Sequence, residues 1–101
     1  MQFTVNEVLT FKMNSGDEVV AKVVAGPDDH GYITVTDPVT VVTTNNGVGM
    51  IPTIMTAEHN AQNKLNTNNI SMFTLTDDNI KLKYLEATTG ISVPTKKLIM
   101  G

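Results

Sequence analysis

Two short runs in the chain combine carboxylates with a histidine, as metal sites and acid–base catalysts do. The first is Asp28, Asp29 and His30, and the second is Glu58 and His59. The first run lacks the spaced oxygen ligands of a calcium loop, and the second lacks the further histidine that a zinc protease carries on the same helix. We therefore expect no metal site, and we interpret the aspartates as turn residues, because Asp side chains cap turns.

Other catalytic patterns are missing from the sequence. The 101 residues include no cysteine, which excludes thiolate nucleophiles, disulfides and thiolate metal ligands. No nucleophile elbow, phosphate-binding loop or dinucleotide glycine pattern occurs. The sequence therefore predicts a protein that is not an enzyme and that uses no cofactor.

The rings of His30 and Tyr32 are candidates for stacking on nucleobases, which contributes about 1–3 kcal/mol per base. The alternative is a surface loop whose histidine is only solvated and whose tyrosine begins a strand. The net charge of −3 and the absence of arginine argue against non-specific binding to duplex nucleic acid. Any nucleic-acid site must therefore use lysines, amides, hydroxyls and rings.

The composition predicts a mostly β protein. Thr occurs 15 times, Val 12 times and Asn 10 times, and the first two favour strands while Asn favours turns. Residues 1–101 suit one domain with a single modest core. No apolar run is long enough to cross a membrane and no targeting segment is visible, so we expect a cytoplasmic protein with no membrane partner.

Five segments carry strand signals, and we expect them to form a meander. Turn residues 14–17 separate the first two segments, and Val19, Ala21 and Val23 alternate on one apolar face of the second. The third segment is the longest, and Asp37 and Pro38 interrupt it, which predicts a bend. The predicted strands are residues 8–13, 18–25, 32–43, 70–75 and 80–86.

Residues 44–69 follow no clear period and exceed the usual upper length of about 12–15 residues for a structureless connection. A functional loop, an extra hairpin and partial disorder all remain open. The apolar residues at 50, 51, 54 and 55 favour burial against the barrel or a neighbouring subunit. Residues 87–101 form a predicted extension, with a short helical turn beginning at Ser92 or Pro94 and ending at Met100.

The order of hairpin, acidic loop and long bent strand resembles the first motif of the Sm and Sm-like family. Gly16 matches the glycine of the family's first hairpin, and "DDHGY" at 28–32 matches its first loop. The stretch "TDDNIKLKYL" at 76–85 is similar to the second motif. The resemblance covers roughly residues 8–43 and 70–86, and the Asn-rich, Arg-free style looks more like the Sm-like proteins encoded by marine phages than like cellular members.

This resemblance implies a small, strongly bent, five-stranded antiparallel barrel with a long insertion at 44–69 between the third and fourth strands. It implies a closed homomeric ring, made by pairing the strand at 70–75 of one subunit with the strand at 80–86 of the next. Exposed strand edges give the same expectation, since an unpaired edge is open to another chain.

The resemblance also implies binding of single-stranded RNA. Asp28, His30 and Tyr32 would bind it from the first loop, with the rings stacking, and Asn79 would supply amide contacts from the second. Tyr32 replaces the family's asparagine, and Asp77 stands near the place of its arginine. The alternative function is a non-enzymatic assembly or adaptor module that uses the same barrel without RNA and docks partners on the apolar "MIPTIM" segment, 50–55.

Overall fold

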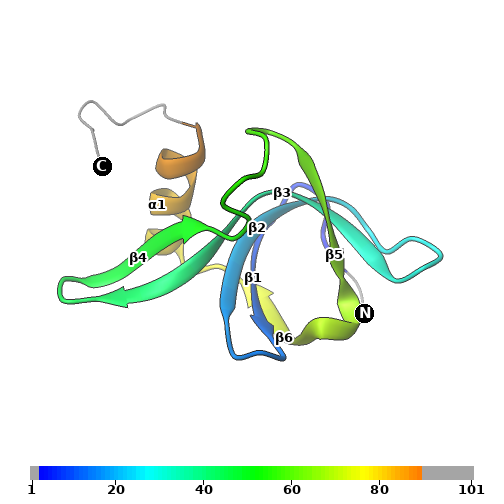
Figure 1. Ribbon diagram of the computed structural model, residues 1–101, viewed down its shortest axis with the longest axis horizontal. Helices are drawn as coiled ribbons and strands as arrows, with labels where there is room; N and C mark the ends of the chain where they lie inside the picture. Colours follow the sequence, from blue (N-terminus) through cyan, green and yellow to red (C-terminus); the bar gives the residue numbers. More distant parts are fainter. Residues whose placement is uncertain (1–2, 90–101) are drawn as a thin grey trace.

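The computed structural model describes residues 3–89 of the chain, as one curved sheet with a helix against it (Figure 1). The elements, in chain order, are β1 (Val8–Met13), β2 (Glu18–Ala25), β3 (Tyr32–Thr44), β4 (Gly47–Pro52), β5 (Gln62–Asn66), the 3₁₀ turn η1 (Thr67–Asn69), β6 (Ile70–Leu75) and α1 (Asp78–Thr89).

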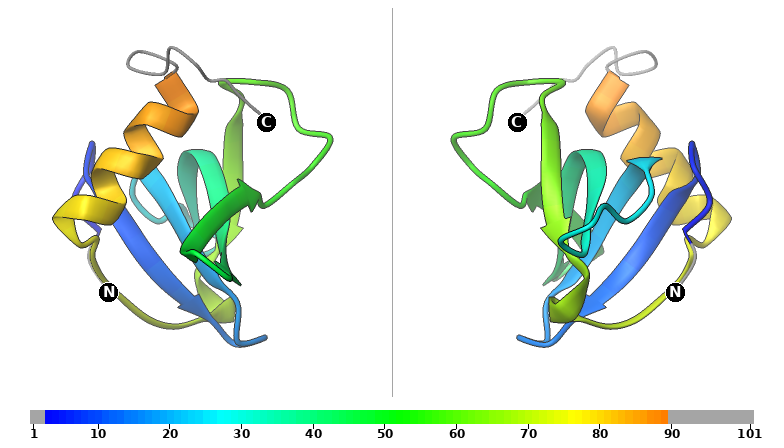
Figure 2. Two further views of the ribbon diagram at one scale, coloured as in Figure 1. Left: turned by 90° about the vertical axis from the view of Figure 1, so that its left-hand side faces the viewer. Right: turned by 90° about the vertical axis from the view of Figure 1, so that its right-hand side faces the viewer.

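All six strands belong to one antiparallel sheet with the order β4-β3-β2-β1-β6, and β5 also pairs with β3. The mostly β fold expected from composition is confirmed. The strand count of five is wrong, and the sheet is open, because no ladder among residues 3–89 joins β6 to β4 or β5. Both views in Figure 2 show the strong curvature of this sheet, which wraps around its concave face.

The first hairpin forms as the sequence predicts. Phe11 of β1 lies opposite Val19 of β2, and the Met13 N–H donates to the Asp17 carbonyl at 2.8 Å across the turn. Gly16 has a φ of +99°, a conformation that costs glycine little and costs residues with a Cβ more. This glycine therefore has a geometric reason to stand in the turn.

The main core fills the concave face of the sheet. Ala21 and Val23 are fully buried there, as their alternation predicts. The rings of Phe3, Phe11 and Phe73 pack in tilted pairs with centroids 4.6–6.4 Å apart. The buried residues of this cluster are Phe3, Leu9, Phe11, Ala21, Val23, Ile33, Val35 and Ile70.

The predicted bend in β3 is present. Between the pairs Val20↔Val39 and Lys22↔Thr36, β2 contributes one residue and β3 contributes two, which is a β-bulge. The bulge holds Asp37, whose φ is +48°, and Pro38, which has no N–H to give to a ladder. Beyond it, β3 changes partner on the edge opposite β2, because β5 pairs with residues 32–36 and β4 with residues 39–44.

The segment at 44–69 is an ordered part of the sheet. Thr44 ends β3, the turn at residues 45–46 leads into β4, and β5 and η1 follow. The extra-hairpin alternative is therefore confirmed for β3 and β4. The sequences of β4 and β5 show no clear alternation of apolar and polar residues. Every residue of these two strands is exposed or half-buried, so neither face is uniformly apolar.

The predicted strand at 80–86 is wrong, because these residues lie within the helix α1. The alternation of Ile80, Leu82 and Tyr84 suggested one strand face, but Leu82 is 60% exposed and Tyr84 is 2% exposed. Ile80, Tyr84 and Leu85 pack against the sheet, and the spacing of four residues between Ile80 and Tyr84 is that of one helical face. Lys, Leu, Glu and Ala are also good helix formers.

Helix α1 covers the face of the sheet opposite the main core. Tyr84 packs there with Val8, Val20 and Val39 in a second buried cluster. This explains why Val20 is buried although it alternates with the inward residues of β2. In the described range, no helix has the length and apolarity to cross a membrane, and the predicted helical turn at 92–100 lies outside that range.

Candidate functional site

Asp28 shapes the loop between β2 and β3. Its carboxylate Oδ1 accepts hydrogen bonds from the N–H groups of His30 at 2.8 Å and Tyr32 at 3.0 Å. The Tyr32 and His30 N–H donors hold the pKa of Asp28 below its usual value, because they stabilise the charged form. Asp28 is therefore a turn-forming residue.

The same loop is tied to the turn η1. The carbonyl oxygen of Gly31 accepts from the N–H of Thr67 at 2.9 Å and from its Oγ1 at 2.7 Å. Gly31 has a φ of +84°. Hydrogen bonds to Asp28 within the loop and to Thr67 of η1 therefore fix the backbone from which the loop side chains project.

His30 and Tyr32 are the side chains that this loop presents. His30 is exposed, and Tyr32 is 36% exposed at the start of β3. Tyr32 lies opposite Asn66 of β5, whose Oδ1 accepts from the Asn68 N–H at 2.9 Å. The structure thus places both predicted rings, those of His30 and Tyr32, at one corner of the sheet.

Lys64 of β5 supplies a positive charge near this corner. Its Nζ donates to the Thr34 hydroxyl at 2.8 Å, and its charge contributes to the lowered pKa of Asp28. Sequence reasoning missed Lys64 and Asn66, because they lie in the segment without a clear period. One sequence signal for this strand was available, because the half-buried Leu65 stands between the polar residues Lys64 and Asn66.

Asn79 lies apart from the other predicted residues. It stands in the first turn of α1, and Figure 1 shows α1 and the β2–β3 loop on opposite sides of the molecule. Its N–H donates to Asp77 Oδ2 at 3.0 Å. The predicted set of four is therefore divided, and within one chain Asn79 does not share a site with His30 and Tyr32.

The acidic pair in the second motif belongs to the helix start. Asp77 Oδ2 also accepts from the Ile80 N–H at 3.2 Å, so Asp77 is the N-cap of α1. Asp78 follows in the first turn, where the helix dipole favours negative charge. The predicted hairpin turn at 76–79 is therefore a helix cap, which explains aspartates where the Sm-like pattern has an arginine.

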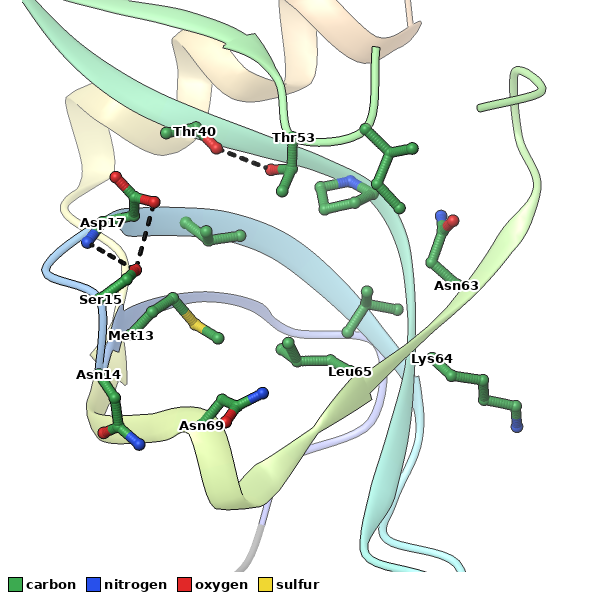
Figure 3. A pocket seen from close by; sticks show the side chains of 14 residues that line it. Met13, Asn14, Ser15, Asp17, Thr40, Thr53, Asn63, Lys64, Leu65 and Asn69 are labelled. Atoms are coloured by element: carbon green, nitrogen blue, oxygen red, sulfur yellow. Dashed lines mark hydrogen bonds between the residues drawn. The ribbon is translucent and has the colours of Figure 1, made fainter. Parts of the chain in front are cut away.

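A groove opens at one end of the concave face, with a volume of about 460 Å³. Figure 3 shows Met13 and Leu65 pointing toward each other at its floor, while Lys64 is directed away. Polar atoms at its rim pair with each other, as in the 3.1 Å bond between the hydroxyls of Thr40 and Thr53. This concave groove therefore offers a ligand mainly apolar surface.

A second groove, of about 330 Å³, lies between the end of α1, β4 and residues 53–61; we call it the helix groove. Its apolar lining residues are Pro38, Val39, Met50, Pro52, Ile54, Met55, Ala57 and Ala87. Asp37, Glu58 and His59 also line it, and His59 Nδ1 lies 4.0 Å from Asp37 Oδ1. Within residues 3–89, no three His, Cys, Asp or Glu side chains are grouped to hold a metal ion.

Two sheet edges carry exposed apolar side chains. On β6, Met72 and Leu75 are each 66% exposed, and on β4, Val48 and Ile51 are 41% and 44% exposed. Among the described strands, β6 pairs only with β1 and β4 only with β3. Each of these strands therefore leaves one row of backbone donors and acceptors open.

Comparison with known proteins adds no relative. No protein-family model matches this chain, and no curated protein is significantly similar to it.

Proposed function

We propose that this protein is a non-enzymatic Sm-like β module that assembles with copies of itself through its free sheet edges. The observation that carries the proposal is the outer edge of β6, which pairs with no other described strand, while Met72 and Leu75 of β6 are exposed. Soluble proteins usually protect such an edge with charges, prolines or a covering element. The β6 sequence ISMFTL contains no charge and no proline, so a second strand is the natural cover.

The partner edge in this proposal is β4 of the next copy. The partner strand expected at 80–86 is helical, so it cannot extend a sheet. The β4 sequence GVGMIP also lacks charge, and its exposed Val48 and Ile51 match the apolar character of β6. Pairing of β6 with β4 is a head-to-tail contact, which closes into a ring when the rotation between copies allows it.

The native mass of the full chain tests this assembly. We expect light scattering after gel filtration to give a mass of several chains at micromolar concentration. Met72→Lys places a charge on the β6 edge and should shift the mass toward one chain. Leu82→Lys changes a residue that is 60% exposed on α1 and should assemble like the parent. A parent mass of one chain, or a Met72→Lys variant that assembles fully, contradicts the proposal.

Single-stranded RNA binding at the β2–β3 loop is the second candidate. It is supported by the fixed loop that presents His30 and Tyr32, with Lys64 close enough to act on Asp28. Rings held in place lose little entropy when a base stacks on them. A ring of copies would repeat this corner around its rim and multiply weak contacts.

Fluorescence polarisation with labelled uridine-rich and adenine-rich RNA tests this candidate at low and moderate salt. Loss of one stacking contact in His30→Ala or Tyr32→Ala should weaken binding by roughly 5- to 150-fold. Asn79→Ala is the matched control, because Asn79 lies on the other side of the molecule. Absence of binding at low salt, together with intact assembly, favours the adaptor alternative, which the exposed Ile54 and Met55 support.

A further inference from the structure

The helix groove has an apolar wall that no described residue covers. Ile54 is 47% exposed and Met55 is 72% exposed, and both line the groove. Exposed apolar side chains that lie together mark a surface whose burial by another segment lowers the free energy. The groove therefore favours an occupant with bulky aliphatic side chains.

The groove also has a defined charge. Asp37 and Glu58 line it, and no lysine among residues 3–89 does. The imidazole of His59 also lines the groove, with its Nδ1 4.0 Å from Asp37 Oδ1. An occupant that carries ammonium groups beside its aliphatic residues therefore complements the groove better than a purely apolar one.

The chain itself contains a segment with this chemistry. The last turn of α1 forms part of the groove wall through Ala87 and Thr88, and α1 ends at Thr89. In the sequence that follows, Lys96 and Lys97 come directly before Leu98, Ile99 and Met100. Two lysines beside three bulky aliphatic residues match two carboxylates beside an apolar wall.

We propose that residues 96–100 bind in the helix groove of the same chain, with the aliphatic residues on Ile54 and Met55 and the lysines near Asp37 and Glu58. Residues 90–95 connect the end of α1 to this segment, and because an extended chain spans about 3.3–3.6 Å per residue, they can reach back to a groove whose wall includes Ala87 and Thr88. Binding within one chain also has a high effective concentration, since only this short connection separates the segment from the groove wall. This inference is independent of the proposed assembly and gives the apolar surface of the adaptor alternative an occupant within the chain.

Disulfide trapping tests the proposal. Because the chain contains no cysteine, the only thiols present are the two that are introduced. The full-length double variant Met55→Cys with Ile99→Cys is oxidised and separated without reductant. A disulfide requires Cα atoms within about 7 Å of each other. We expect a cross-link within one chain that forms at a rate independent of protein concentration.

The matched control is the pair Leu82→Cys with Ile99→Cys, because Leu82 is exposed on the same helix but does not line the groove. The Met55 pair should cross-link at least tenfold faster than this control. Equal rates for the two pairs overturn the proposal, and so does a cross-link that joins two chains, which would assign the groove to a second copy.

The charge component has its own test. Adding Glu58→Lys to the Met55→Cys with Ile99→Cys variant should slow the intramolecular cross-link several-fold at low salt, because the introduced ammonium group would repel Lys96 and Lys97. The difference should shrink at high salt, where exposed charges are screened. A cross-linking rate that Glu58→Lys leaves unchanged at low salt contradicts the placement of the lysines.

Discussion

The hydroxyl of Tyr84 donates a hydrogen bond to the carbonyl oxygen of Thr36 at 3.0 Å. It also accepts one from the N–H of Lys22 at 3.2 Å. These two backbone groups face each other where the bulge at Asp37 shifts the pairing of β2 and β3. A side chain of α1 therefore replaces a ladder bond that the bend in the sheet would otherwise leave open.

Tyr84→Phe should destabilise the fold by about 1–3 kcal/mol, because it leaves a part-buried N–H and a part-buried carbonyl without their partner. The ring keeps its packing in this variant, so the loss reports the hydroxyl. Urea unfolding followed by circular dichroism measures it. Tyr32→Phe is the control, since the Tyr32 ring is 36% exposed and its change should stay near zero.

The stability of the protein should fall at alkaline pH in a manner that depends on Tyr84. Burial, with a contribution from the Asp37 carboxylate, raises the pKa of the Tyr84 hydroxyl above its usual value. The unfolded chain then loses this proton first, as the pH rises past about 10. Because the folded state binds more protons there, the free energy of unfolding decreases with rising pH.

Urea titrations at several pH values between neutral and alkaline measure this slope. The parent should lose stability above about pH 10 more steeply than Tyr84→Phe does, since the two proteins differ only in this hydroxyl. Parallel curves for the two proteins would show that Tyr84 ionises as readily in the folded state as in the unfolded one.

Asp77→Ala should cost about 1 kcal/mol, with a range of roughly 0.5–2 kcal/mol, because it removes the N-cap of α1. Asp77→Asn keeps an oxygen that can accept from Asn79 and Ile80, so its effect should be much smaller. Thermal unfolding of the two variants beside the parent separates them. Equal stability of Asp77→Ala and the parent would argue against a helix that begins at this residue.

Asp28→Ala should loosen the β2–β3 loop without disturbing the sheet. The N–H groups of His30 and Tyr32 lose their acceptor, so their hydrogen exchange should become faster while that of the central strands stays slow. Since the pKa of Asp28 is lowered, the parent loop should keep its protection from hydrogen exchange down to acid pH. This protection should be lost as the pH falls through the lowered pKa of Asp28.

Strand patterns predicted the central sheet well. The first hairpin, the bend at Asp37 and Pro38 and the strand at 70–75 were all visible, because turn residues bound the runs of strand-forming residues and Pro38 interrupts the longest run. The pattern misled at 80–86, where alternating apolar residues also fit a short helix. Asp77, which caps that helix, looks the same in sequence as an Asp in a hairpin turn.

The candidate site was only partly predictable. Local sequence places His30 and Tyr32 on one loop, and Asp28 before them as a turn former, because these relations span a few residues. The effect of Lys64 on Asp28 depends on the long-range pairing of β5 with β3. The separation of Asn79 from the β2–β3 loop depends on the path of α1. Such relations follow from tertiary structure, and a single sequence does not specify them without it.

The bulge in β3 also bears on how this chain tolerates change in length. Because β4 and β5 pair with different halves of the same strand, residues 53–61 connect two registers that are fixed independently. Lengthening a surface connection costs little, about 0.6 kcal/mol for each doubling of its length. Added residues at this point would therefore enlarge a loop beside the helix groove without shifting either strand.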